Sequence, residues 1–468
     1  MTGEVARHNE NPLGYEPIRK LLVKFAVPAI VSMLVNALYN IVDQIFIGRG
    51  VGYLGNAATT VAFPVFTITL AIGTLLGGGA SAYAAIKLGE KKNDIAEKTL
   101  GNMFTLTIIT GVFLSCLCFL FFEPMLKLFG ATENVMYYAK EYTSIILFGT
   151  PFMMVGIGLS NMARTDGAPK LSMYSMLAGA ILNTILDPIY IFVFHWGVTG
   201  AAIATITSQI ISASVVFWYF IRKGNMRIRK KYLKPEFKLS VSFATLGISS
   251  CIVQSAATLL QIAMNNSLVY YGNLSEVGGD IALSAMGIVM KVNAILIGIL
   301  VGISMGSQPI LGFNKGARRP KRIYETYKTA VLIGSAVALL GWASCMFIPE
   351  VILGWFGDSG EKFMQFGTRC MSVYLAGIFT AGFQIISTGY FQATGQPLKA
   401  SILSLLRQII FLIPLIFILP LFFGLDGILY AGPVADISSA LIVAAFIGHE
   451  IKKLKVWISE YEEDSNMF

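Results

Sequence analysis

The sequence predicts an all-α polytopic membrane protein in which twelve transmembrane helices form two pseudo-symmetric six-helix lobes. Three observations predict this fold. Of the 468 residues, 55% are hydrophobic and only 13% are charged, and a mean hydropathy of +0.69 means more apolar surface than a water-soluble domain can bury. Twelve apolar runs are long enough to cross a bilayer. The second half of the chain also repeats motifs of the first.

The apolar runs each hold about 20 residues or more, the length that crosses about 30 Å of hydrocarbon. Because no open strand satisfies its backbone in lipid, each run is predicted to be a helix. The runs lie at 21–48, 58–86, 99–122, 142–163, 171–194, 198–221, 241–270, 281–313, 326–348, 370–392, 400–421 and 427–448.

A repeat divides these spans into six and six. The exit of the second span, GGGASAYAAIKLGEKK, aligns with SMGSQPILGFNKGARR at an offset of 227, which matches Gly79 to Gly306 and Gly89 to Gly316. Two later loops, TDGAPK and GVTGAA, match ATGQPLK and GLDGIL at nearly the same offset. Gly/Pro-rich loop ends resemble each other in many membrane proteins, but three ordered matches favour a duplication.

The longest basic loop separates the two halves. We predict an N-terminal lobe over residues 1–221, a cytoplasmic basic linker over 222–240 and a C-terminal lobe over 241–468. Equivalent helices are six spans apart and therefore cross the membrane in the same direction. The lobes are thus expected to be related by an axis along the membrane normal and to enclose a shared cavity.

The distribution of Lys and Arg predicts the orientation. With the N-terminus in the cytoplasm, 27 of the 35 basic residues fall on the cytoplasmic side, as the positive-inside rule requires. Both termini are therefore predicted to be cytoplasmic, in a multi-pass protein of the cell membrane. The net charge of +9 then reflects topology and contact with membrane lipid, and no nucleic-acid partner is expected. A monomer is expected.

The first span carries an acid, Asp43, among apolar residues. A charge near mid-bilayer costs about 2.5–3.5 kcal/mol even on the lenient scale, so such an acid indicates function. Ser32, Asn36, Tyr39 (or Asn40) and Asp43 follow helical spacing and share one face, which is predicted to face the cavity. Pro28 is expected to kink this helix because it lacks an N–H and its ring clashes with the preceding turn.

The seventh span repeats this polar stripe without the acid. Gln254, Thr258, Gln261 and Asn265 again lie at i, i+4, i+7 and i+11. Such side chains either link helices, at about 0.6 kcal/mol each, or line the substrate cavity. If both stripes line the cavity, the N-terminal lobe supplies its ionisable group and the C-terminal lobe only neutral polar contacts.

A second acid accompanies Asp43 in the N-terminal lobe. Asn183 and Asp187 lie one turn apart in the fifth span, and Thr205 lies at a similar depth in the sixth. Two carboxylates in a low dielectric share a proton readily, and oxygen ligands equally suit a hard cation such as Na⁺. Beyond a possible Na⁺ here, no metal and no cofactor are expected.

Other charges also lie inside the spans. Arg407 and Asp436 are predicted to form a structural ion pair, whereas Lys291 has no evident partner and is expected to repel or replace cations in the C-terminal part of the cavity. The sequence gives little evidence for an enzyme, because the three histidines lie at loops or span ends and no nucleophile–base set or phosphate-binding loop is present.

Pro28 and six motifs occur in order along nearly the whole chain. They are VDQIFIGRG (42–50), RTDGAPK (164–170), NTILDPIYIF (183–192), GVTGAAIAT (197–205), GFNKGAR (312–318) and TGQP (394–397). Together they resemble the multidrug and toxic compound extrusion (MATE) family, most closely its bacterial MepA-like branch. The resemblance implies a V-shaped pair of lobes and secondary antiport of amphipathic, often cationic drugs against H⁺ or Na⁺.

The resemblance also implies where the cation binds. In several members a helix-1 Asp, a helix-5 Asn and Asp, and a helix-6 Thr form the cation-coupling site, and Asp43, Asn183, Asp187 and Thr205 match them one by one. Another branch is described as using acids in helices 7 and 10. This sequence has glutamines in helix 7 and no acid in helix 10, which leaves Asp436 as the only candidate acid in the C-terminal lobe.

The function predicted first is therefore secondary active export of small-molecule drugs or toxic organic compounds by alternating access. A lipid-linked saccharide flippase of the same superfamily is the alternative. A flippase would be expected to have a more cationic cavity, and only Lys291 and Arg407 would supply positive charge there. A membrane-embedded enzyme is a third possibility and would need catalytic residues clustered at one interface.

Overall fold

The fold is described by a computed structural model, which covers residues 12–51, 53–129, 131, 133–355 and 361–466. Within these residues there are helices and no strands, and twelve helical segments are long and apolar enough to span a membrane. The predicted all-α membrane fold is thus confirmed. Of the counted basic residues, Arg7 lies outside the described residues.

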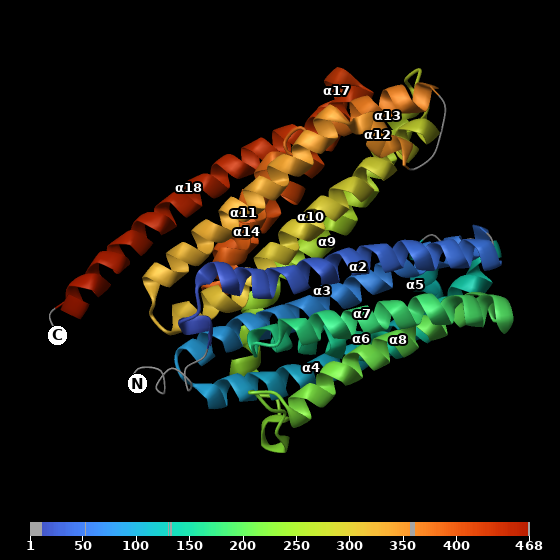
Figure 1. Cartoon of the computed structure of the whole chain (residues 1–468). Helices are drawn as coiled ribbons and strands as arrows, with labels where there is room; N and C mark the ends of the chain where they lie inside the picture. Colours follow the sequence, from blue (N-terminus) through green and yellow to red (C-terminus); the bar gives the residue numbers. More distant parts are fainter. Residues whose placement is uncertain (1–11, 52, 130, 132, 356–360, 467–468) are drawn as a thin grey trace.

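The first bundle contains the helices of the N-terminal half (Figure 1). A short 3-10 turn, η1 (Pro12–Gly14), precedes them. The helices are α2 (Ile18–Val51), α3 (Tyr53–Gly89), α4 (Asn93–Leu120), α5 (Phe122–Leu128), α6 (Glu133–Thr165), α7 (Pro169–Pro188), which continues as the π-helical turn η2 (Ile189–Val193), and α8 (Gly197–Arg222).

The second bundle contains the helices of the C-terminal half, after a 3-10 turn in the linker, η3 (Lys230–Tyr232). Its tenth and eleventh spans are broken into short segments. The helices are α9 (Phe237–Asn273), α10 (Gly279–Gly316), α11 (Pro320–Phe347), α12 (Pro349–Gly354), α13 (Glu361–Tyr374), η4 (Ile378–Thr380), α14 (Ala381–Ala393), α15 (Pro397–Leu405), η5 (Leu406–Leu412), α16 (Ile413–Ile418), α17 (Pro420–Phe423) and α18 (Leu425–Asn466).

The repeat seen in the sequence recurs in the backbone. Six of the residues with positive φ angles form three pairs at offsets of 227 or 228, each at a junction between helices. The pairs are Lys91 (60°) and Arg318 (52°), Gly167 (91°) and Gly395 (79°), and Gly197 (56°) and Gly424 (58°). The equivalent loops of the two halves therefore turn in the same way.

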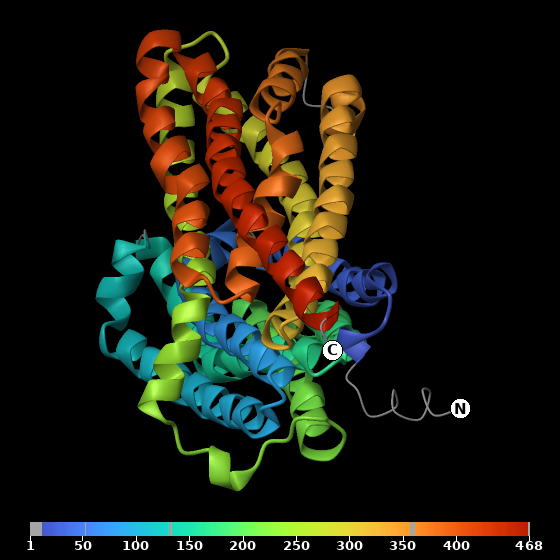
Figure 2. The ribbon, with the colours of Figure 1, turned by 90° about the vertical axis from the view of Figure 1, so that its left-hand side faces the viewer.

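The two bundles meet near the end of the molecule where α2 begins and α18 ends, and they diverge toward the other end (Figure 1). The most extensive contacts between them join α2 to α10, α3 to α9 and α3 to α10. In the view turned by 90°, the helices of the second bundle stand upright above those of the first (Figure 2). The molecule is thus V-shaped: the bundles are in contact at the end where α2 begins, called the closed end, and are apart at the other, called the parted end.

Glycines allow the bundles to touch at the closed end. A Cβ added at Gly89 would lie 1.9 Å from the carbonyl oxygen of Phe313, and one added at Gly316 would lie 1.9 Å from that of Ile86. These two contacts are equivalent under the repeat. Any larger residue at either glycine would force α3 and α10 apart, so the glycines of the repeat serve close packing of the lobes.

The first helix of each half begins in the core of the opposite bundle. Leu13 and Phe25 are buried among residues of α10, α11 and α14, whereas Leu239 and Phe243 are buried among residues of α3, α4 and α6. The amide of Asn314 also donates to the carbonyl oxygen of Leu13 at 3.0 Å. Both crossings bind one lobe to the other at the closed end.

The basic linker is held on the N-terminal bundle. Arg229 forms an ion pair with Glu97 at 2.8 Å, and the backbone N–H groups of Asn225 and Met226 donate to Asp166 at 2.9 and 2.8 Å. These partners are buried, with Glu97 6% and Asp166 4% exposed. The segment predicted as a linker between the lobes is therefore also a docked part of the first lobe.

Candidate functional site

The structure brings together the acids and polar residues that the sequence singled out in the N-terminal half. Asn183 and Asp187 lie one turn apart on α7, and the amide of Asn183 donates to Asp187 Oδ1 at 3.3 Å and to Thr205 Oγ1 at 3.4 Å. Asp43, from α2, lies against Asp187, close enough for one carboxyl group to hydrogen-bond the other. Three helices thus supply one cluster.

This acid cluster, formed by Asp43, Asn183, Asp187 and Thr205, is buried and incompletely satisfied. Asp187 is 0% and Asn183 2% exposed. One oxygen each of Asp43, Asn183 and Asp187 is buried without a hydrogen-bond partner. No ion pair with Lys or Arg involves either carboxylate in the part of the chain that the structure describes.

Such an arrangement is stable only if something else compensates the charge. Two adjacent carboxylates in a low dielectric repel each other strongly when both are ionised. A proton shared between them, or a hard cation bound by the unpaired oxygens, removes this repulsion. The donor set contains only oxygen ligands, which fits H⁺ or Na⁺ equally.

Two tyrosines border the acid cluster. Tyr39 is on the same helix as Asp43, and Tyr142 reaches the cluster from α6; both interact electrostatically with the two carboxylates. Tyr142 is also packed among Ile47 and Ile191, which close the cluster off on that side. No pattern in the sequence pointed to Tyr142, because its helix is distant along the chain and carries no polar stripe there.

The polar stripe of α2 does not face the other lobe. Gly302 and Gly306 of α10 pack against Ile30 and Ala26 of α2, which fixes the face of α2 that meets the C-terminal bundle. At about 100° per residue, Asn36, Tyr39 and Asp43 lie roughly a quarter turn or more from this face. Tyr39 interacts with Asp43 and Asp187 on the side of α7, and the lining of a cavity between the lobes by Asn36 and Tyr39 stays a prediction.

The polar stripe of α9 does face the other lobe. Gly247 of α9 packs against Leu75 of α3, and Gln254, Gln261 and Asn265 share that face by helical spacing. Gln261 is exposed, and its amide donates to Asn265 Oδ1 at 2.9 Å. These residues follow Gly247 along α9, the helix that runs from the closed end of the molecule toward the end where the two bundles diverge (Figure 1).

Arg407 and Asp436 form an ion pair in the C-terminal bundle. Asp436 is 3% exposed, and the amide of Gln384 donates to its backbone carbonyl at 2.9 Å. Both charges are therefore compensated. Lys291, by contrast, is exposed on α10 and has no ion-pair partner among the described residues.

Pro28 lies inside α2, which runs without interruption from Ile18 to Val51. The hydroxyl of Ser32 donates to the carbonyl oxygen of Pro28 at 2.8 Å. Hydroxyl bonds of this kind favour bending. The kink at Pro28 stays a prediction.

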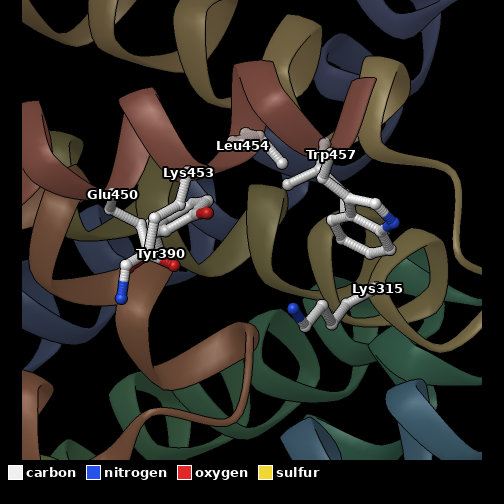
Figure 3. A pocket seen from close by; sticks show the side chains of 7 residues that line it. Lys315, Tyr390, Glu450, Lys453, Leu454 and Trp457 are labelled. Atoms are coloured by element: carbon white, nitrogen blue, oxygen red, sulfur yellow. The ribbon is translucent and has the colours of Figure 1, made fainter. Parts of the chain in front are cut away.

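A pocket lies at the opposite end of the molecule from the parted bundles, beside α18 (Figure 3). Lys315 and Trp457 face each other there, with the ammonium 4.7 Å from the ring centroid. Glu450 is already paired with Lys399 at 2.9 Å. The pocket is thus a packed charged contact between α18 and its bundle, separate from the acid cluster.

The fold is that of a multi-pass membrane transporter. The sequence matches the MatE family over residues 28–189 and 250–418, and the chain belongs to this family.

Relatives of known name align over almost the whole chain. The multidrug export protein MepA of Staphylococcus aureus (strain NCTC 8325 / PS 47) is 26% identical over 450 residues, covering 96% of this chain and 97% of its own. MepA of Staphylococcus saprophyticus is 27% identical over 435 residues, covering 90% and 92%.

Solved structures share the fold. The MATE multidrug transporter DinF-BH, solved as a complex, is 33% identical, with a TM-score of 0.86 over 93% of this chain and 96% of its own. An outward-facing MATE family transporter of the MOP superfamily is 21% identical, with a TM-score of 0.87 over 95% and 98%. The latter likeness concerns the fold alone.

Proposed function

We propose that this protein is a secondary active multidrug exporter, which antiports amphipathic, often cationic drugs against H⁺ or Na⁺ by alternating access. The observation that carries the proposal is the acid cluster: two adjacent buried carboxylates with three unpaired oxygens and no cationic side chain paired to them among the described residues. A structural cluster would be expected to be paired, as Arg407 and Asp436 are. The names of the relatives favour drug export over a lipid-linked saccharide flippase.

The geometry supports a mechanism in which the cation and the drug compete through one lobe. Binding of H⁺ or Na⁺ neutralises Asp43 and Asp187, and this removes the negative field that holds a cationic drug beside α2. Each ligand then lowers the affinity of the other by the same factor, and a coupling of about 1–3 kcal/mol corresponds to about 5- to 150-fold.

Alternating access follows from the V shape. With both termini in the cytoplasm, as the basic residues predict, the parted end of the bundles faces outward and the glycine contacts of α3 and α10 close the cytoplasmic side. Inward opening then requires Gly89 and Gly316 to separate from their partner carbonyls. The transporter would act as a monomer in the cell membrane, with lipid around it.

The test is dye efflux from proteoliposomes under separately imposed pH and Na⁺ gradients. A proton gradient alone, a Na⁺ gradient alone, or either is expected to drive dye out against its own gradient, and the effective gradient identifies the coupling ion. Dye movement that never exceeds equilibration under any gradient would contradict antiport. Empty liposomes and liposomes with Asp43→Asn serve as controls.

A further inference from the structure

Lys291 is a charged residue of a membrane-spanning helix to which the proposed mechanism gives no role. Lys291 is exposed, yet it lies within a helix of the membrane-spanning part, Ile281–Gly316. An ammonium in the hydrocarbon costs about 2.5–3.5 kcal/mol on the lenient scale. Its helix, α10, is flanked by α2, α3, α9, α11, α13 and α14. Lys291 therefore needs water or an anion where one side of α10 is not covered by a neighbouring helix at its depth.

The packing of α10 on α2 identifies that face. A Cβ added at Gly306 would lie 2.5 Å from Ala26 Cα, one at Gly302 2.7 Å from Ile30 Cα, and one at Gly298 3.8 Å from Met33 Cβ. These glycines therefore mark the α2-facing side of α10. The rising distances show that the helices separate toward the parted end, in agreement with their course in Figure 1.

Lys291 continues this line of glycines. It lies seven residues before Gly298, which is about two turns and the same face of the helix. Beyond it, Gly287 has no atom within 4 Å of an added Cβ. The lysine thus faces α2 where the two bundles have parted.

The same register places Lys291 at the depth of the acid cluster. The contacts pair Gly306 with Ala26 and Gly302 with Ile30, so the helices run antiparallel. Two more turns along this register bring Lys291 opposite the turn of α2 that precedes Asp43. The space between the bundles therefore has an ammonium on one wall, while two carboxylates lie behind the other wall at a similar level.

We infer that Lys291 binds the carboxylate of an amphiphilic substrate, so that the transporter selects zwitterionic amphiphiles over simple organic cations. A zwitterion places its cationic end on the side of the acid cluster and its carboxylate at Lys291. A monocation satisfies the acid side only and is repelled by the ammonium. This inference rests on the proposed export function and names its substrate class.

A pair of dyes tests the inference. Rhodamine 6G is a monocation, and its free acid has the same ring system with the ethyl ester replaced by a carboxylate. Affinities of both dyes are measured by fluorescence anisotropy with the detergent-solubilised full chain. The Lys291→Met variant is expected to bind the free acid roughly 10-fold or more weakly, the size of a lost hydrogen bond to a charged group. Its affinity for rhodamine 6G should stay equal or rise.

Two further variants separate recognition from structure. Lys291→Arg keeps the charge and should retain the preference for the free acid, and Lys291→Gln replaces the Met variant if that one does not fold. Lys328→Met is the matched control, because Lys328 is also an exposed lysine of a spanning helix but lies on α11. It should leave both affinities unchanged.

Several outcomes would overturn the assignment. These are an unchanged ratio of the two affinities in Lys291→Met, an equal loss for both dyes, or no binding of either dye by the wild-type protein. Failure of the export function looks different: the wild-type protein would bind both dyes with the expected ratio in detergent but move neither against a gradient in proteoliposomes.

Discussion

The two lobes share one fold but treat their buried acids in opposite ways. In the N-terminal lobe, Asp43 and Asp187 lie against each other and leave buried oxygens without partners. In the C-terminal lobe, Asp436 is paired with Arg407. The first arrangement needs a mobile cation to be stable, whereas the second is complete by itself. Duplication thus accounts for the shared fold of the two lobes, and the different treatment of their buried acids accounts for the proposed ion coupling.

The largest expected effect comes from fixing the neutral form of the acid cluster. Asp43→Asn keeps the volume but removes the titratable group, so we expect a folded protein without uphill efflux. Drug affinity in detergent, measured from about pH 5.5 to 8 with and without Na⁺, should no longer depend on either ion, because the amide that replaces the carboxyl group is neutral at every pH. Binding that keeps the wild-type ion dependence would place the coupling site elsewhere, and Asp436 would then be the next residue to test.

Asp187→Asn is the companion variant for this experiment. If the two carboxylates share the ion, its loss of coupling should equal that of Asp43→Asn. A milder effect would identify Asp43 as the principal titrating group. Thr205→Ala, which removes one oxygen ligand and keeps both acids, should weaken Na⁺ dependence more than H⁺ dependence because a proton needs no third ligand.

Breaking the ion pair of the C-terminal lobe should lower the stability of the protein but leave the ion dependence of drug binding unchanged. Asp436→Asn leaves Arg407 without its counter-charge, and removing one member of a buried pair costs about 3–5 kcal/mol. A clearly lower melting temperature in detergent is expected, with the ion dependence of drug binding intact. The double variant Arg407→Met/Asp436→Leu should recover much of the stability. Loss of ion dependence in that double variant would make the pair part of the coupling site.

The sequence predicted the fold because length and hydropathy alone decide where a helix can cross a bilayer. Each predicted span corresponds to a helical segment, but the helices extend farther; α18 ends at Asn466, whereas the prediction ended at 448. Polar helix ends outside the hydrocarbon carry no hydropathy signal. The break of the tenth span around η4 was likewise missed, because its residues are as apolar as those of a continuous helix.

The acid cluster was predictable residue by residue, since an acid in an apolar span is costly and helical spacing brings Asn183 next to Asp187. The rotation of each helix about its axis was not predictable. The stripe of α2 turns toward α7 and that of α9 toward α3, which depends on the glycine contacts of Gly302 and Gly247. Tyr142 was missed for a related reason, because only tertiary packing brings α6 to Asp187.

Another buried carboxylate, Asp166, extends the comparison between the acids, because its hydrogen-bond partners are neutral donors. It accepts bonds from the N–H groups of Asn225 and Met226 and from the hydroxyl of Tyr219 at 2.8 Å. Burial outweighs these bonds and raises the pKa of Asp166 from 3.8 to about 6. Asp166 therefore binds a proton more readily when the linker is docked over it than when the linker is undocked.

The sign of the pH dependence follows from this raised pKa. Docking of the linker is most stable at low pH and loses stability as the pH rises through about 6, by about 1 kcal/mol between about pH 5 and 7.5. Hydrogen exchange at Asn225 and Met226, corrected for the intrinsic rate, should show more protection at the lower pH. In Asp166→Asn this pH dependence should vanish. Protection that grows as the pH rises over this range in the wild-type protein would refute the prediction.

The smallest expected effect concerns the neutral stripe of α9. Gln261→Ala or Asn265→Ala removes a polar contact of about 0.6 kcal/mol, or roughly threefold in affinity, so the ranking among drugs should change while the ion dependence stays. Asn266→Ala is the matched control, because this exposed asparagine lies on a different face of α9. The measurement is the affinity of each variant and of the wild-type protein for a panel of dyes in detergent. An equal loss for every dye, or a loss of ion dependence, would show that the C-terminal wall takes part in coupling, and the contrast between the lobes would then fail.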